Sequence, residues 1–393
     1  MAEHAARLER LLHTHQDVAC VQGTAEALVK KDELLVLNQH ADAVHGAARR
    51  WVDRREDFAE IGVARLRLRA GARIDVPALV DELRGGASGQ RRTSVTPNHV
   101  LRGEPGMTGG PFGGPSPTAA LPAPSPAAAA DGTGRRVVVG VLDTGIDAHP
   151  WFAGTDWYGH CTAEEHEDLA GPHDWELDSE AGHGTFIAGV ILQMAAAAYL
   201  RVERVLAADG VCDELELLHS LARLTRRSAT AGDDVDVVNL SLGCFTFDDR
   251  PSPVLADAIA RLARTTVVVA AAGNDSSDRP FWPAALKDVL AVAALAKAHG
   301  ADGPERASFS NYGWWVDAST VGEDVASSFL TVDEQDQAFR GYATWSGTSF
   351  AAPRVAGSIA ALMSDLNVTA RDAVSMLLDP AVGTHTPDLG AVV

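Results

Sequence analysis

The sequence is poor in cysteine. Only four cysteines occur in 393 residues, at Cys20, Cys161, Cys212 and Cys244, and no two of them form a C-x-x-C pair. A disulfide-stapled secreted domain needs an even set of cysteines at short spacings in an exported chain. The pattern therefore argues against a disulfide framework and predicts reduced thiols.

Long apolar runs are missing as well. The first twenty residues indicate an amphipathic helix and lack the apolar core of about 7–15 residues that marks a secretory signal. No run of about 18 apolar residues occurs anywhere in the chain, so no membrane span is expected. With the reduced thiols, these absences predict a cytoplasmic location and no membrane partner.

Basic residues are outnumbered by acidic ones. The chain has 33 Lys and Arg against 53 Asp and Glu, and its net charge is −20. Binding to nucleic acid or to an anionic membrane requires clustered Lys and Arg, so neither is an expected partner. The 46% of hydrophobic and 22% of charged residues are typical of a globular protein.

One segment, residues 103–134, is nearly free of large apolar side chains and is rich in Pro, Gly and Ala. Such a segment cannot bury enough surface to offset the entropy lost on ordering. It predicts a flexible or partly extended linker. The chain is thereby divided into an N-terminal domain (1–102), the linker (103–134) and a C-terminal domain (135–393).

The N-terminal region alternates between strand-like and helix-like patterns. We expect strands at 32–37, 63–68 and 94–100 and helices at 41–52 and 76–83, from apolar residues at periods of two and about 3.6. This order predicts a small α+β (ferredoxin-like) domain.

The C-terminal region predicts an α/β domain. Residues 136–142 are nearly all apolar, as in a parallel strand that is buried on both faces. The remaining strands are expected at 200–207, 235–240, 266–271 and 289–294, and the helices at 183–194, 214–226, 254–264 and 349–366. Such alternation is typical of a parallel sheet flanked by helices, with its active site at the carboxyl ends of the strands.

Three motifs of the C-terminal domain carry an Asp, a His and a Ser. VLDTGID (141–147) presents Asp143, GHGTFIAG (182–189) presents His183, and SGTSFAAP (346–353) presents Ser349. A serine hydroxyl becomes a good nucleophile when a histidine takes its proton, and a buried carboxylate orients that histidine. Asp143 follows a predicted strand and Ser349 begins a predicted helix, where an α/β active site is expected.

The order Asp, His, Ser along the chain is that of subtilisin and differs from the orders of chymotrypsin and the α/β-hydrolases. With AAGN (271–274) and ASFSNYG (307–313), residues 136–378 resemble a subtilisin-like serine protease, or subtilase. The resemblance implies a subtilisin-like fold, a serine endopeptidase that forms an acyl-enzyme on Ser349, a peptide or protein substrate, and no cofactor.

The resemblance also implies two binding features. Asn274 would donate its side-chain amide to the oxyanion that develops during acyl transfer. Ser241, Leu242 and Gly243 would form the strand along which an extended substrate binds. Gly243 would leave room for the substrate side chain beside the cleaved bond.

By pattern and position, the N-terminal domain resembles the propeptide that precedes many subtilase domains. That resemblance implies an intramolecular inhibitor and a self-processing zymogen, cut within residues 103–134. An unrelated docking domain of similar size is the alternative.

A metal site is not expected. His160, Cys161, His166 and His173 lie close together between the first two motifs, but their spacing matches no common zinc pattern, and solvated loop residues are the favoured interpretation. Calcium sites need clustered Asp side chains and carbonyl groups, which the sequence does not locate.

Two other functions stay open at this point. A peptide-processing subtilase would use the same nucleophile for leader trimming or macrocyclisation. A non-catalytic interaction module with the subtilase fold would not need the chemical residues, all of which are present.

Overall fold

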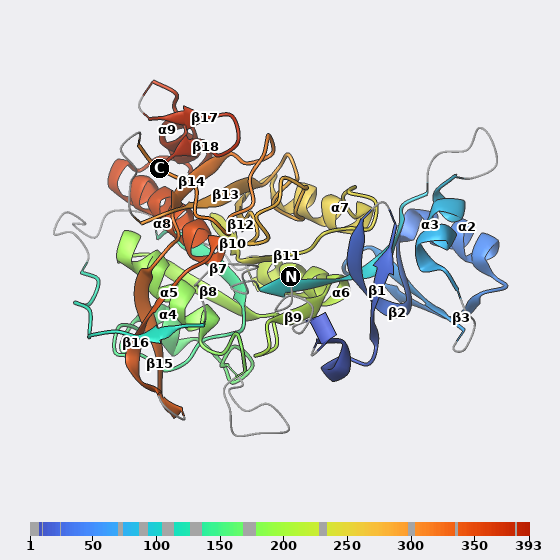
Figure 1. Cartoon of the computed structure of the whole chain (residues 1–393), viewed down its shortest axis with the longest axis horizontal. Coiled ribbons are helices and arrows are strands. Elements are labelled where there is room, and N and C mark those ends of the chain that lie inside the picture. Colours follow the sequence, from blue (N-terminus) through green and yellow to red (C-terminus); the bar gives the residue numbers. More distant parts are fainter. Residues whose placement is uncertain are drawn as a thin grey trace.

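The computed structural model (Figure 1) describes most of the chain. The described residues are 8–9, 11–23, 25–69, 74–85, 93–103, 114–125, 136–167, 178–227, 234–297, 303–334, 337–381 and 383–393.

A mostly parallel sheet forms the centre of the C-terminal region. Its strands are β7 (Val138–Asp143), β8 (Tyr199–Arg204), β10 (Val237–Leu240), β12 (Val267–Ala271), β13 (Leu290–Leu295), β14 (Ala318–Val321), β17 (His385–Thr386) and β18 (Gly390–Val392). Their order is β17-β18-β14-β13-β12-β10-β7-β8, and only the β17–β18 pair is antiparallel. The predicted parallel sheet is therefore confirmed.

Helices cover both faces of this sheet. They are α4 (Asp156–Gly159), α5 (His183–Met194), α6 (Glu214–Arg227), α7 (Pro253–Leu262), α8 (Thr348–Leu366) and α9 (Ala370–Leu377). Successive residues of β7 point to opposite faces, so Val139 and Val141 pack with α5 and α8, whereas Val138 and Leu142 pack with α6 and α7. Within the described part of the chain, no helix is both long and apolar enough to cross a membrane.

The N-terminal region has a β-α-β-β-α-β order. Its elements are β2 (Glu26–Leu37), α2 (Asn38–Ala48), β3 (Val52–Phe58), β4 (Val63–Leu68), α3 (Val76–Gly85) and β5 (Val95–Gly103), with β1 (Val18–Gln22) as an added strand. The sheet runs β5-β2-β4-β3 and its pairs are antiparallel. The sequence analysis missed β3, because this edge strand, VDRREDF, buries only Val52 fully and is otherwise mostly charged.

Strand β5 joins the N-terminal sheet to the C-terminal region. It pairs with β9 (Val211–Asp213) on one side and with β11 (Leu242–Gly243) on the other. The register with β11 places Gly103 opposite Leu242 and Arg102 opposite Gly243. In Figure 1 this strand runs from the N-terminal elements toward the centre of the molecule. The N-terminal domain therefore adds a strand to the substrate-binding segment that the sequence analysis expected.

Buried polar contacts reinforce this docking. His99 of β5 lies 3.1 Å from the carboxylate of Glu214 at the start of α6, and both side chains are 1% exposed. Arg84 at the end of α3 forms a 2.6 Å ion pair with Asp248. Because buried polar groups are costly unless they are paired, these contacts favour one docked arrangement over others.

Part of the predicted linker is an ordered strand. Within residues 114–125, β6 (Ser116–Pro117) pairs with β16 (Gln337–Trp345), which forms a hairpin with β15 (Val325–Glu334). The hairpin was not predicted. Residues 104–113 and 126–134 of the predicted linker lie outside the described residues, and Gly103 is the last residue of β5.

Candidate active site

Asp143 and His183 form the central contact of the site. Asp143 ends strand β7 and His183 begins helix α5, and both side chains are fully buried. The Nδ1 atom of His183 lies 2.7 Å from Oδ1 of Asp143, which also accepts a hydrogen bond from the Thr144 N–H at 2.8 Å. Because a carboxylate only accepts hydrogen bonds, Nδ1 carries the proton and Nε2 is left as a proton acceptor.

The imidazole of His183 is held by close packing. The residue before it, Gly182, has φ +85°, and a Cβ there would lie 2.9 Å from Cδ2 of Phe329. The imidazole contacts the rings of Trp345 and Phe350, at centroid distances of 5.6 and 5.4 Å. Its Nε2 atom is buried without a hydrogen-bond partner among the described residues. The ring is thus fixed in place with its basic nitrogen open to a proton.

Ser349 is the second residue of α8. Its hydroxyl lies 3.4 Å from the carbonyl oxygen of Ser241, and its own carbonyl accepts a 2.9 Å hydrogen bond from the Ser241 hydroxyl. The next residue, Phe350, packs on the His183 ring. These contacts bring the third motif to the same place as the first two. The backbone N–H of Ser349 lies in the first turn of α8.

Asn274 is oriented by Thr348, a residue that the sequence analysis did not single out. The Asn274 amide oxygen accepts hydrogen bonds from the N–H and the hydroxyl of Thr348, at 2.8 and 2.9 Å. The same hydroxyl accepts a 3.0 Å bond from the Gly273 N–H. With its oxygen bound in this way, Asn274 turns its NH₂ group toward Gly347, whose Cβ position lies 3.6 Å from Nδ2. The only sequence signal for this role of Thr348 was its position in the third motif, directly before Ser349.

The predicted substrate-binding residues have separate surroundings. The Ser241 hydroxyl is buried, accepts from the Asn239 amide at 2.9 Å and supports Ser349 as described above. Leu242 and Gly243 form β11, which is paired with β5. The space beside Gly243, which was expected to be open, contains the ring of Phe281, so that expectation was wrong.

Glu167 is a further residue that the sequence analysis missed. Its carboxylate accepts a 2.7 Å hydrogen bond from the Gly182 N–H and also interacts with the Thr144 side chain. It therefore links the residue after Asp143 to the residue before His183. Burial raises the pKa of Glu167 to about 8, and the negative charge of Asp143 contributes to the rise. No sequence signal marks this residue, because it lies 15 positions from Gly182.

The residues of the rejected zinc hypothesis are engaged elsewhere. His160 contacts the carbonyl of Asp156 at 2.7 Å, and Cys161 contacts the carbonyl of Trp157 at 3.7 Å. His166 packs edge-on against Tyr158. In the described ranges no group of three or more His, Cys, Asp or Glu side chains has the geometry of a metal site, and His173 lies outside those ranges.

Replacing Glu167 with Gln should change how stability depends on pH. The pKa of this carboxyl rises from 4.5 to about 8 on folding, so between those values the native state holds a proton that the unfolded state releases. Wild-type stability should therefore fall as pH rises through this window. Glu167→Gln keeps an oxygen that accepts from the Gly182 N–H, and it does not titrate. The Tm of the variant minus the Tm of the wild type should therefore increase as the pH rises from 5 to 8.

The control for this measurement is the exposed Glu164→Gln, which should follow the wild-type curve. Parallel Tm curves for Glu167→Gln and the wild type across the window would show that this carboxyl does not hold its proton.

Known proteins resemble this chain in sequence. The Subtilase family description matches residues 134–387. The "Thermophilic serine proteinase" of Bacillus sp. (strain AK1) is 34% identical over 264 residues, which cover 63% of this chain and 58% of that protein. "Subtilisin BL" of Lederbergia lenta is 32% identical over 249 residues, which cover 60% of this chain and 78% of that protein. The chain thus spans less than two thirds of the length of the first of these relatives.

The fold also has a solved counterpart. Fervidolysin from Fervidobacterium pennivorans, described as a keratinolytic enzyme related to subtilisin, matches 93% of this chain and 60% of its own, with a TM-score of 0.62 and 18% sequence identity. At this identity the likeness concerns the fold alone. Since the family match takes in more than half of the sequence, and since the sheet and the fold agree with it, the chain belongs to the subtilase family of subtilisin-like serine proteases.

Proposed function

We propose that this chain is a serine endopeptidase that hydrolyses peptide bonds through an acyl-enzyme on Ser349. The observation that carries the proposal is the buried 2.7 Å contact between Asp143 and His183, with Phe350, the residue after Ser349, packed on the same imidazole. The cytoplasmic location stays a prediction.

The chemistry follows from the roles that these groups can take. The Ser349 hydroxyl attacks the substrate carbonyl while Nε2 of His183 accepts its proton, and Asp143 stabilises the imidazolium that forms. The oxyanion receives hydrogen bonds from the Asn274 NH₂ group and the Ser349 backbone N–H. His183 then gives the proton to the leaving amine, and a water molecule repeats the sequence to release the acyl group.

The substrate would be a peptide in extended conformation. Strand β11 provides a backbone edge that ends beside Ser349, since the Ser241 carbonyl lies 3.4 Å from the hydroxyl. A peptide paired with this edge would be held straight across the site, because strand addition binds the main chain irrespective of most side chains.

We extend the proposal to the N-terminal domain, as an inhibitor of the same chain. Its strand β5 lies between β9 and β11, the position that an extended substrate would need. While β5 stays there, a substrate cannot pair with β11. Release by a cut in residues 103–134 would make the chain a self-processing zymogen.

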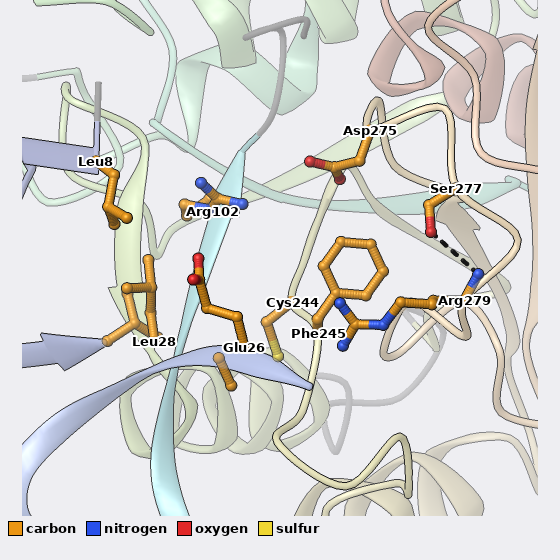
Figure 2. A pocket seen from close by; sticks show the side chains of 11 residues that line it. Leu8, Glu26, Leu28, Arg102, Cys244, Phe245, Asp275, Ser277 and Arg279 are labelled. Carbon is orange, nitrogen blue, oxygen red and sulfur yellow. Dashed lines mark hydrogen bonds between the residues drawn. The ribbon is translucent and has the colours of Figure 1, made fainter. Parts of the chain in front are cut away.

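The boundary between the two regions supports the proposal that the N-terminal domain can dissociate from the C-terminal region. A cavity of about 370 Å³ lies between them, lined by Glu26, Leu28 and Arg102 from one side and by Phe245, Asp275 and Arg279 from the other (Figure 2). This cavity is partly open to solvent, so the two regions are not in close contact along the whole boundary between them.

Labelling with a fluorophosphonate probe tests the nucleophile. The wild type should be labelled on Ser349, and Ser349→Ala should not be labelled at all. Asn274→Ala should fold normally and lose about 10²- to 10³-fold in turnover, the effect known for the corresponding donor of subtilisin. A folded wild type that takes no label after removal of its N-terminal domain would rule out the catalytic proposal and favour an interaction module.

The masses of the products separate hydrolysis from macrocyclisation. Hydrolysis adds one water to each cleaved bond, whereas cyclisation of a precursor does not. Products without added water would replace the endopeptidase with a peptide-processing enzyme that uses the same nucleophile.

Weakening the docked domain tests inhibition. Arg84→Glu places two negative charges together where Arg84 and Asp248 now form a 2.6 Å pair, so the labelling rate of the full chain should rise. The control is Arg50→Glu, at a residue that is 70% exposed and whose contacts among the described residues include Glu82 and Trp51 of the same region. Equal rates in all three proteins would argue against an inhibitory role.

The length of the purified chain tests self-processing in the same set. Ser349→Ala should accumulate as the full chain, whereas the wild type should lose its N-terminal domain. Equal lengths on a gel, together with faster labelling of Arg84→Glu, would indicate an inhibitor that stays attached.

A further inference from the structure

Two glycines mark the place where the substrate residue beside the cleaved bond would put its side chain. The bond lies next to Ser349, between β11 on one side and the segment that ends at Asn274 on the other. Gly243 belongs to the first of these segments and Gly273 to the second. In the proposed endopeptidase, the side chain on the N-terminal side of the cleaved bond (P1) would enter between them.

The ring of Phe281 already occupies this space. A Cβ added to Gly243 would overlap the ring, at 2.8 Å from Cδ1, and would lie 2.7 Å from the Trp282 carbonyl oxygen. A Cβ added to Gly273 would lie 3.1 Å from Cγ and Cδ1 of the same ring. The ring therefore touches the backbones of both glycines at once.

The ring cannot move aside easily. Phe281 is 1% exposed and belongs to the hydrophobic core that contains α6 and α7. The next residue, Trp282, exchanges two backbone hydrogen bonds with Cys244, at 2.8 and 2.9 Å. On another side, the Phe281 ring packs edge-on against Phe245 at a centroid distance of 5.2 Å. Displacing the ring would break this packing, and close-packed cores resist such changes.

We infer that Phe281 closes the P1 side-chain pocket and restricts this enzyme to substrates with Gly or Ala at that position. The inference rests on the proposed endopeptidase function and names its substrate class. A leucine or phenylalanine side chain would have to overlap the buried ring. Gly and Ala place at most one methyl group between Gly243 and Gly273.

A panel of peptides that differ only at P1 tests the inference. In a preparation whose Ser349 takes the fluorophosphonate label, kcat/KM for Gly and Ala peptides should exceed that for Leu and Phe peptides by about 10- to 100-fold, the range in which pockets discriminate by size. Phe281→Ala should raise kcat/KM for the Leu and Phe peptides relative to kcat/KM for the Ala peptide. Mass spectra of the products identify the cleaved bond.

Phe245→Ala is the matched control, because it removes a neighbouring aromatic ring that does not lie between the two glycines. It should keep the wild-type order of substrates. If Phe281→Ala does not fold, Phe281→Leu gives a smaller opening, and the wild-type panel alone still decides. Wild-type cleavage of the Phe or Leu peptide as fast as the Ala peptide would overturn the inference.

Fluorophosphonate labelling of the same preparations tests the proposed nucleophile separately from the P1 preference. Label on Ser349 without the preference for small residues would overturn the inference and leave the proposed function standing. Absence of label on folded protein freed of its N-terminal domain would overturn both.

Discussion

The hydrogen bond between Asp143 and His183 is the constraint on which the rest of the site depends. Both side chains are fully buried, so water does not compete for the 2.7 Å contact, and the imidazole has one tautomer and one orientation. The fold supplies this contact because Asp143 ends a central parallel strand and His183 begins a helix that packs on the same sheet. Glu167 then connects the side chain of Thr144 with the backbone of Gly182.

A second constraint comes from the edge of β11. This short strand follows Ser241, whose hydroxyl donates to the Ser349 carbonyl, and it is paired with β5 of the N-terminal region. It is also the edge along which we propose that an extended substrate binds. These uses compete for the same backbone hydrogen bonds. The proposed activity therefore depends on the position of β5 as well as on Asp143, His183 and Ser349.

Local patterns were enough to predict the frame of the site. A nearly all-apolar run predicted the strand before Asp143, because a buried strand has a strong short-range signature. Helices were predicted to begin at His183 and Ser349, and the structure begins them at His183 and Thr348. The charged edge strand β3 escaped prediction, since only Val52 of it is fully buried. In the N-terminal domain, the order of elements was therefore easier to predict than their number.

The features that tune the site could not be predicted in the same way. Thr348 binds Asn274 from 74 positions away, and Phe281 fills the space beside Gly243 from a separate loop. Such contacts are set by the packing of the whole domain, and no periodicity in the sequence records them. The expectation that Gly243 leaves open space beside it failed for this reason. A glycine can indicate that another group lies close to the backbone, but it does not identify that group.

The most direct measurement of the central claim is the rate at which a fluorophosphonate labels Ser349 in Asp143→Asn, compared with the wild type. The substitution keeps the shape of the side chain and allows the wrong imidazole tautomer, so the rate should fall by about 10⁴-fold, the effect known for this change in serine proteases, while the protein stays folded. An unchanged rate in a folded variant would mean that the buried carboxylate does not orient His183, and the account of the site would be wrong.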